Sequence, residues 1–245
     1  MRMAWVIVAL LGGCGTVVSD ELYFTNDDRA LLCAESLDDY LVPVNWDVLQ
    51  DRIDVAVREQ WVLNVYAHAP GVTIADDTLD RALTMFEAAG LAFSTYHLLD
   101  PSAPPRAGVV LSFDDDDAAA WTSIQPLLAR HHAIATFFVS GYDGWSADDR
   151  ARLHALADDG HAVEAHTLHH LRADCYPEGP EAYVRDEVLP SLDALRSDGF
   201  AAESFAYPGG DRNDASDAAI APHVRYLRGT ARSCTYATAA PRVEE

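Results

Sequence analysis

From residue 45 onward, short apolar runs alternate with segments whose apolar residues recur at helical spacing. The runs are rich in β-branched and aromatic residues and are bounded by Gly, Pro and Asp, which is typical of buried parallel strands. The strand candidates are residues 62–68, 91–98, 109–113, 135–140, 162–166, 204–207 and 224–228. Seven strands with helices between them predict an α/β fold, either a (β/α)7 barrel or a strongly curved sheet.

The chain has 245 residues, which favours a single domain, because barrels of up to about 250 residues fold as one unit. We expect the barrel to span residues 45–235. Residues 14–44 are expected to form an N-terminal tether and lead-in, and residues 236–245 a tail.

The first residues resemble a signal peptide. Arg2 precedes an apolar run from Ala4 to Leu11, and small residues follow before a polar break. The run is too short to span a bilayer, which takes about 20 residues. Leu11-Gly12-Gly13-Cys14 is similar to the bacterial lipobox, so we expect residues 1–13 to be removed and Cys14 to be lipidated. The sequence therefore predicts an exported protein, anchored by lipid on the periplasmic or outer face of the cell envelope.

Three further cysteines are Cys33, Cys175 and Cys234. An exported chain meets an oxidising environment, so we expect one disulfide and one free thiol. The sequence alone leaves all three pairings open.

The formal net charge is −22, and the sequence contains no lysine. Such a field repels nucleic acids and anionic lipid headgroups. We therefore expect no nucleic-acid partner, and contact with a membrane only through the lipid anchor.

Two strand ends carry candidate metal ligands. Four carboxylates, Asp114 to Asp117, follow the strand at 109–113, and carboxylate oxygens are good ligands for divalent cations. His166 and His170 follow the strand at 162–166, and their spacing brings both imidazoles to one side if the segment is helical. Two histidines and one carboxylate leave an open position for water, as in catalytic zinc sites.

A third segment, Tyr207-Pro208-Gly209-Gly210, follows another strand candidate. Two glycines after a proline permit a tight turn and a close approach of the backbone to a ligand. All three segments lie at carboxyl ends of strands, where parallel β-α enzymes build their sites.

These segments resemble the NodB-homology polysaccharide deacetylase family. Gly108 to Asp115, Ala135 to Gly141 and Gly160 to His170 match the family in order and spacing, and the likeness extends over residues 108–210. The resemblance implies the (β/α)7 barrel of the polysaccharide deacetylase type.

The resemblance also implies roles for the residues of the three segments. Asp114 falls on the position of the catalytic base, and Asp115, His166 and His170 fall on those of the metal ligands. In the same way, the segment containing Tyr207, Pro208 and Gly209 falls on the lining of the acetyl pocket.

The chain departs from the family pattern at three places. Asp116 stands where Gly is usual, which leaves its role open, and Ala206 stands where many members carry an Arg that braces the base. The family's last strand carries a catalytic His, but this chain stops soon after Thr230.

A strand near the front of the chain can supply the missing histidine. Residues 61–68 form an apolar run that ends in His68, and the helix and strand that follow match the family's final elements. We therefore interpret the chain as circularly permuted, with residues 45–100 as the relocated final β-α elements and residues 108–230 as the motif-bearing part. His68 then becomes the general acid.

The predicted function is metal-dependent hydrolysis of acetyl groups on an N-acetylated polysaccharide or cell-wall glycan. The metal is expected to be Zn²⁺, although the ligand types also admit Co²⁺, Mn²⁺ or Ni²⁺. Two alternatives stay open at this point: an O-acetyl polysaccharide esterase on the same scaffold, and a non-catalytic sugar-binding lipoprotein.

Lipidation at Cys14 should place the mature protein in the membrane fraction, because the several acyl chains of a lipoprotein together give stable membrane binding. Cell fractionation and mass spectrometry of the mature N-terminus measure this. An unmodified N-terminus beyond residue 14 would show ordinary secretion instead.

Overall fold

The computed structural model describes residues 20–237, with side chains through residue 234. The predicted signal peptide, the lipidation site at Cys14 and the end of the predicted tail lie outside these residues. Within the described range, no helix is both long enough and apolar enough to cross a membrane.

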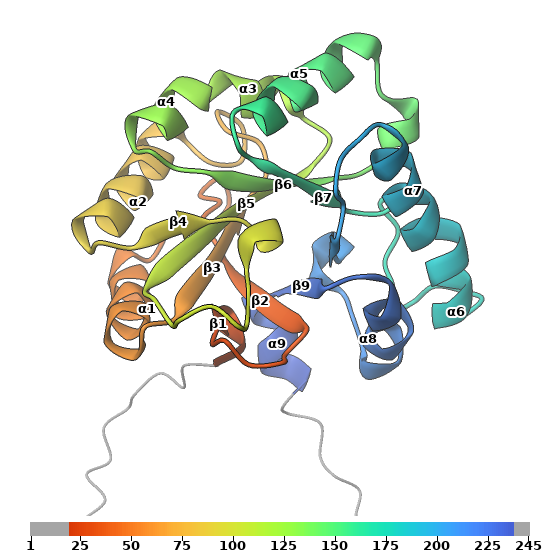
Figure 1. The fold of residues 1–245 in the computed structure, drawn as a ribbon, viewed down its shortest axis with the longest axis horizontal. Helices are drawn as coiled ribbons and strands as arrows, with labels where there is room; N and C mark the ends of the chain where they lie inside the picture. The colour runs from red at the N-terminus through yellow and green to blue at the C-terminus, as the bar shows by residue number, and fades with distance from the viewer. Residues whose placement is uncertain (1–19, 238–245) are drawn as a thin grey trace, which may run out of the picture.

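The described chain folds into strands surrounded by helices (Figure 1). The strands are β1 (Tyr23–Phe24), β2 (Leu31–Ser36), β3 (Val62–Ala67), β4 (Ala92–Ser94), β5 (Gly108–Asp115), β6 (Ala135–Val139), β7 (Ala162–Ala165), β8 (Ser204–Ala206) and β9 (Tyr226–Thr230). The α-helices are α1 (Trp46–Glu59), α2 (Asp76–Ala88), α3 (Ala118–Ser123), α4 (Gln125–Arg130), α5 (Ala147–Asp158), α6 (Pro180–Tyr183), α7 (Leu189–Ser197), α8 (Asp214–Ile220) and α9 (Ala231–Ala237). Short helical turns are η1 (Asp20–Leu22), η2 (Tyr96–Leu98), η3 (Tyr142–Gly144), the π-helical η4 (Val184–Val188), η5 (Pro208–Gly210) and η6 (Ala221–His223).

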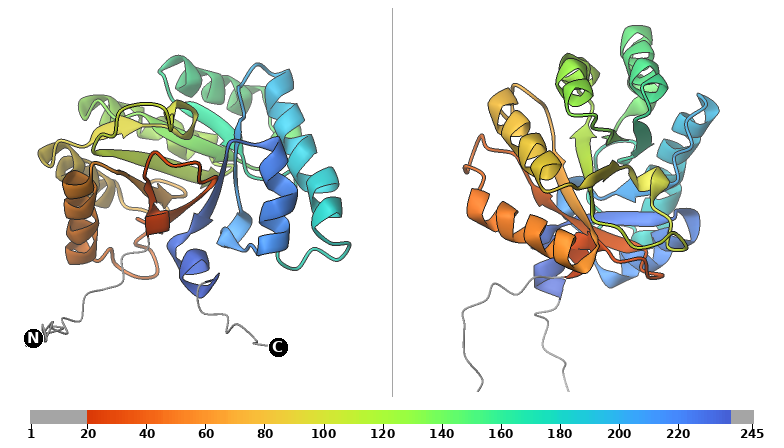
Figure 2. Two further views of the ribbon diagram at one scale, coloured as in Figure 1. Left: turned by 60° about the horizontal axis from the view of Figure 1, so that its bottom comes forward. Right: turned by 60° about the vertical axis from the view of Figure 1, so that its left-hand side comes forward.

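Seven parallel strands close into a barrel, as expected for a (β/α)7 deacetylase fold. Around the barrel the order is β2, β3, β5, β6, β7, β8 and β9, and β9 pairs with β2 to close the ring. The carboxyl ends of all seven strands therefore meet at one face. The helices cover the outside, as the two further views in Figure 2 show.

The barrel begins earlier than residue 45, so the prediction that residues 14–44 are only a tether and lead-in is wrong. β2 pairs with β9 from Leu31 to Ala34 and with β3 at Glu35 and Ser36. The sequence of β2 hid this role, because it contains no β-branched or aromatic residue and ends in polar ones.

The predicted strand at 91–98 contributes less than expected. Only Ala92–Ser94 is extended, and this short β4 pairs with the start of β5 without joining the closed ring. The chain then turns inward at η2 and places Tyr96 in the barrel interior, where its ring lies 5.1 Å from that of Phe138. Residues 95–98 therefore close the barrel interior and add no strand to the ring.

Strands β2 and β3 fill the space between the last and the first of the motif-bearing strands, β9 and β5. Their direction is parallel to both neighbours. The predicted circular permutation placed the strands at 62–68 and 91–98 in this space, whereas the structure places β2 and β3 there. The permutation itself stays a prediction.

Local sequence signals set the ends of the helices. Asn45 caps α1 by accepting a hydrogen bond from the N–H of Val48, and Ser146 caps α5 in the same way. Gly160 follows α5 with a φ of 92°, a left-handed conformation that favours glycine at helix ends.

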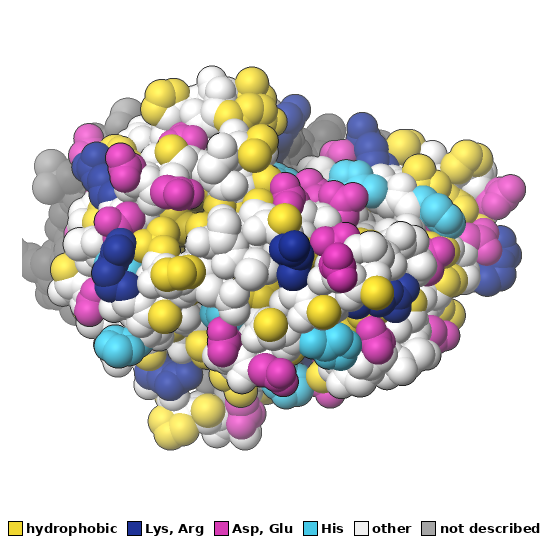
Figure 3. Space-filling view, turned by 90° about the horizontal axis from the view of Figure 1, so that it is seen from above, with side chains coloured by type: hydrophobic (Ala, Val, Ile, Leu, Met, Phe, Trp, Pro, Cys, Tyr) yellow, Lys and Arg dark blue, Asp and Glu magenta, His cyan; other side chains and the backbone are white. Residues whose placement is uncertain are grey.

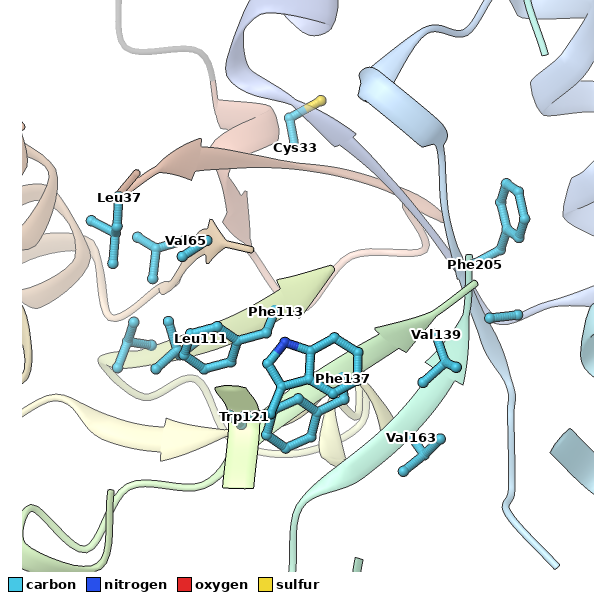
Figure 4. Close-up of a cluster of buried hydrophobic side chains, with 14 of the residues drawn as sticks. Cys33, Leu37, Val65, Leu111, Phe113, Trp121, Phe137, Val139, Val163 and Phe205 are labelled. Carbon is cyan, nitrogen blue, oxygen red and sulfur yellow. The ribbon is translucent and has the colours of Figure 1, made fainter. Parts of the chain in front are cut away.

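Apolar side chains fill two layers. The larger lies between the barrel and the helices, where Trp121 packs on Phe137, which in turn stacks on Phe113 (Figure 4). The smaller fills the barrel interior near the amino ends of the strands and includes Val110 and Tyr226. Because apolar groups close the interior at that end, the polar interior residues face the carboxyl ends of the strands.

Acidic side chains are scattered over one face of the molecule (Figure 3). Figure 3 shows the face formed by α3, α4 and α5, where acidic side chains are interspersed with histidine, apolar and isolated basic ones.

A disulfide joins the two described ends of the chain. Cys33 of β2 bonds to Cys234 of α9, 201 residues later, and Cys175 is an exposed free thiol. The bond spans the seam at which β9 pairs with β2. It therefore ties the first strand of the barrel to the helix that follows the last one.

Replacing both Cys33 and Cys234 by Ser should lower the free energy of unfolding by about 2–5 kcal/mol, because the bond restricts the unfolded chain over a long loop. Denaturant unfolding of the oxidised proteins measures the loss. Cys175→Ser is the matched control and should unfold like the wild type. Equal stability of the double variant would contradict a stabilising role for the bond.

Candidate active site

The four consecutive aspartates after β5 have four different environments. Asp114 points into the barrel and is 3% exposed, and Asp115 faces two histidines. Asp116 is exposed, whereas Asp117 caps α3 by accepting a hydrogen bond from the N–H of Ala120. Mutual repulsion is thus relieved by separating the carboxylates at the end of one strand.

Asp115, His166 and His170 come together at the carboxyl ends of β5 and β7. Asp115 Oδ1 lies 3.5 Å from His166 Nε2 and 3.1 Å from His170 Nε2, and the ring centroids of the two histidines are 5.0 Å apart. Burial opposes ionisation of Asp115, but the close contacts with the two imidazoles outweigh it and lower the pKa of this carboxyl. One carboxylate oxygen and two imidazoles therefore converge on one point.

The segment from His166 to His170 is not helical, contrary to the condition on which its spacing was interpreted. Instead, Thr167 and His170 have positive φ angles of 73° and 55°, and Asp115 across the site has a φ of 88°. Such conformations are costly for residues other than glycine and persist where the surroundings hold them in place. Three of the seven positive-φ residues other than glycine in the described chain thus lie at this one site.

Glu187 holds the histidine loop in this shape. Its buried carboxylate accepts hydrogen bonds from the N–H of His169, at 2.8 Å, and lies 2.7 Å from Nδ1 of the same residue. Its backbone carbonyl accepts a third, from Leu168. Glu187 lies on the π-helical turn η4, an irregularity often found at functional sites.

The donor set fits a divalent metal ion. His166 Nδ1 donates to the carbonyl of Ala206 at 2.9 Å, which leaves the Nε2 lone pair directed at the convergence point. Asp115 Oδ1 is buried and makes no regular hydrogen bond to any of the described residues. The three candidate ligand atoms all lie within 4.8 Å of one another, so a single ion can contact all of them.

Asp114 is bound by an arginine from a different strand. Arg228 of β9 is fully buried and donates from Nη2 to Asp114 Oδ2 inside the barrel. Its guanidinium carbon also lies 4.9 Å from the ring centroid of Tyr66 and 5.3 Å from that of Phe138. The other carboxylate oxygen, Asp114 Oδ1, has no hydrogen-bond partner within the described chain. One carboxylate oxygen of Asp114 is thus held by Arg228, and the other is available to accept a hydrogen bond.

His68 follows β3 and is held by Asp38, which follows β2. Its Nδ1 lies 2.5 Å from Asp38 Oδ2, and its N–H donates to Asp38 Oδ1 at 3.1 Å. Burial disfavours the charged imidazole, but the bond to Asp38 and the charges of Asp114, Asp38 and Asp115 outweigh it and raise the pKa of His68 to about 9. The imidazole is therefore protonated at neutral pH and lies within the electrostatic reach of both carboxylates.

The third predicted segment only partly reaches the site. Ala206 faces the barrel interior, so Tyr207 next to it faces the helices, where it is fully buried and donates to Asp217 at 2.8 Å. The Tyr207 side chain therefore does not face the barrel interior, because side chains alternate along a strand. Substrate binding by Tyr207 stays a prediction. Pro208 is buried in the turn η5.

Gly209 lines a cavity of about 830 Å³ with Arg172, Asp211, Arg212 and Arg232. Arg172 comes two residues after His170 in the sequence, but none of the candidate metal ligands lines this cavity. Its volume is in the range of ligand sites. This part of the third segment is placed where it can contact a bound molecule.

Three residues of the site escaped the sequence interpretation: Asp38, Glu187 and Arg228. A signal existed for Arg228, because a charged residue interrupts an apolar strand at a position that faces the interior. Asp38 was hidden because β2 was not recognised as a strand. No sequence pattern indicated Glu187, since its role is to hold the backbone of the histidine loop in its conformation.

Comparisons with known proteins agree with this geometry. The family model described as polysaccharide deacetylase matches residues 102–224, about half of the chain. No curated protein matches the sequence.

Several solved structures share the fold. The deacetylase PplD of Streptococcus pyogenes, solved in complex with acetate, has 18% identity and a TM-score of 0.53, covering 74% of this chain and 97% of PplD. A de-N-acetylase from Aggregatibacter actinomycetemcomitans has 16% identity and a TM-score of 0.57, with 69% and 94% covered. IcaB from Ammonifex degensii has 18% identity and a TM-score of 0.52, with 66% and 79% covered.

Removing the two histidines should remove the metal. We expect the wild type to bind one Zn²⁺ per chain in equilibrium dialysis, and the His166→Ala/His170→Ala double variant to bind none tightly, because one carboxylate alone is a weak site. His97→Ala, on an exposed histidine that pairs with Glu203, is the control. Near-stoichiometric zinc in the double variant would refute the ligand assignment.

Replacing Asp38 by Asn should shift the pH dependence of any reaction that uses protonated His68. Loss of the carboxylate lowers the pKa of the imidazole by about 1–3 units. The proton-donating form then disappears at lower pH, so the alkaline limb of the pH–rate profile should move toward acid. An unchanged alkaline limb would show that His68 does not donate the proton.

Proposed function

Because the chain belongs to the polysaccharide deacetylase family, we propose that it is a metal-dependent hydrolase that removes acetyl groups from amino sugars of a polysaccharide or cell-wall glycan. The observation that carries the proposal is the convergence of three sets of groups at one barrel face. These are the ligand set of Asp115, His166 and His170, the braced carboxylate Asp114, and the protonated His68.

When bound, a divalent ion at Asp115, His166 and His170 supplies Lewis acidity toward the acetyl carbonyl and a water molecule. Zn²⁺ suits these ligands best among the candidates. The chain's own residues then handle the protons. Asp114 accepts a proton from the attacking water at Oδ1, while Arg228 keeps Oδ2 in place.

His68 completes the reaction at the other end of the scissile bond. As the bond between carbonyl carbon and nitrogen breaks, Nε2 donates its proton to the leaving amine, and acetate remains. Asp38 fixes the tautomer and orientation of the ring through Nδ1. A basic amine is a poor leaving group unless it is protonated, so an imidazole that is charged at neutral pH supports N-deacetylation over O-acetyl ester hydrolysis.

The braced base also weakens the case for a non-catalytic sugar-binding protein. That alternative depended on Ala206, which stands where many family members carry an arginine. In this chain Arg228 of the neighbouring strand makes an equivalent contact with Asp114.

Support for export comes from the Cys33–Cys234 disulfide, because such bonds persist in oxidising compartments. Lipid anchoring through Cys14 remains part of the proposal.

Acetate release from a panel of N-acetylated and O-acetylated glycans tests the function. The Asp114→Asn variant keeps the shape of the side chain but loses the proton acceptor, so turnover should fall about 10²–10⁴-fold with zinc still bound. Full activity of Asp114→Asn would assign the base to another residue, and the first to examine is Asp116. Acetate release from O-acetylated glycans alone would favour the esterase.

A further inference from the structure

Four large apolar side chains project into solvent from the loops that follow β2 and β3. Tyr40 is 60% exposed, Leu41 76%, Val42 72% and Val72 70%. They make up four of the seven large exposed apolar residues in the described chain. We call Tyr40, Leu41, Val42 and Val72 the loop patch. A run of exposed apolar residues on a water-soluble surface is unfavourable unless something binds there.

The loop patch is held in a fixed shape. The N–H groups of Asp39 and Tyr40 both donate to the carbonyl of Thr73, at 3.0 and 3.2 Å, and join the two loops. The carboxylate of Asp39 accepts hydrogen bonds from the N–H of Ala75 and the hydroxyl of Thr78. The apolar side chains are therefore presented by a cross-linked pair of loops.

The same pair of loops holds the proposed acid. Thr73 Oγ1 donates to Asp38 Oδ1 at 2.7 Å, and Asp38 holds His68. Tyr40 follows Asp38 by two residues, so the loop patch begins at the rim of the site. A molecule whose amine approaches His68 has its neighbouring groups close to this patch.

The size and charge of the region argue against two other occupants. Four side chains offer at most a few hundred Å², well below the about 1,000 Å² of a stable protein interface. An anionic lipid surface is repelled by a net charge of −22 and by Asp38 and Asp39 beside the patch. An uncharged sugar chain meets neither objection.

We propose that the loop patch is an accessory subsite that binds the ring faces of sugars next to the one being deacetylated, in a β-linked N-acetylhexosamine polymer. β-Linked pyranoses of the gluco configuration carry their large substituents equatorially, which leaves flat C–H faces for aromatic and aliphatic side chains to cover. Tyr40 combines such an apolar face with a hydroxyl that stays in water. The inference rests on the proposed function, because it assigns the polymer that the site acts on.

The test measures polymer binding separately from turnover. Native gels containing glycol chitin should retard the Asp114→Asn protein. In that background, Tyr40→Ala or the double change Leu41→Ser/Val42→Ser should weaken binding to glycol chitin about tenfold. In otherwise wild-type protein the same changes should raise KM for glycol chitin about tenfold and leave kcat on di-N-acetylchitobiose unchanged. Leu98→Ser, at an apolar position that is 54% exposed and lies at the amino end of the barrel, is the control. Melting temperatures of all variants should match, since the side chains are exposed.

Three results would overturn the inference. One is absence of retardation of the parent Asp114→Asn protein, and another is equal retardation of parent and patch variants. The third is patch-dependent binding to phosphatidylcholine–phosphatidylglycerol vesicles, or patch-dependent dimers in sedimentation velocity, without an effect on glycol chitin. Patch-dependent retardation together with no acetate release from any glycan would instead reject the proposed function and retain the sugar subsite.

Discussion

The ion pair between Arg228 and Asp114 is the interaction on which the rest of the site depends. Both charges lie inside the barrel, and removing them from water costs several kcal/mol per ion unless each is paired. A fully closed ring of strands is what excludes water around them. β2 and β3 complete that ring, so the N-terminal strands are needed to make Asp114 a buried, oriented carboxylate.

The second constraint is backbone strain at the carboxyl ends of the strands. Asp115, Thr167 and His170 adopt left-handed conformations that each cost about 1–3 kcal/mol. The N–H of Ser140 donates to the carbonyl of Asp115, and Glu187 binds the histidine loop, so the surroundings hold these shapes. Strain and support together bring one carboxylate and two imidazoles to a single point.

The two proton-handling groups are distinguished by their partners. Asp114 accepts a hydrogen bond from a permanent cation, whereas His68 contacts the carboxylate of Asp38 and keeps its proton at neutral pH. The loop that supplies Asp38 also presents the exposed loop patch. One local structure therefore positions the proposed acid, His68, and presents the loop patch proposed to contact the polymer.

The sequence by itself determined the parallel β-α architecture and the residues of the candidate metal site. It predicted seven strands, but one of them lies outside the ring and one strand of the ring was missed. Alternating apolar runs, and polar residues directly after strands, are local patterns that survive without knowledge of the fold. It did not determine which segments close the ring. The apolar run at 91–98 resembled a barrel strand, whereas the sequence of β2, with Cys33 and Ala34, did not. Nor could it predict the pairing of Cys33 with Cys234, the brace from Arg228 or the partner of His68. These contacts join residues roughly 30 to 200 positions apart, and only closure of the barrel brings such distant segments within bonding distance.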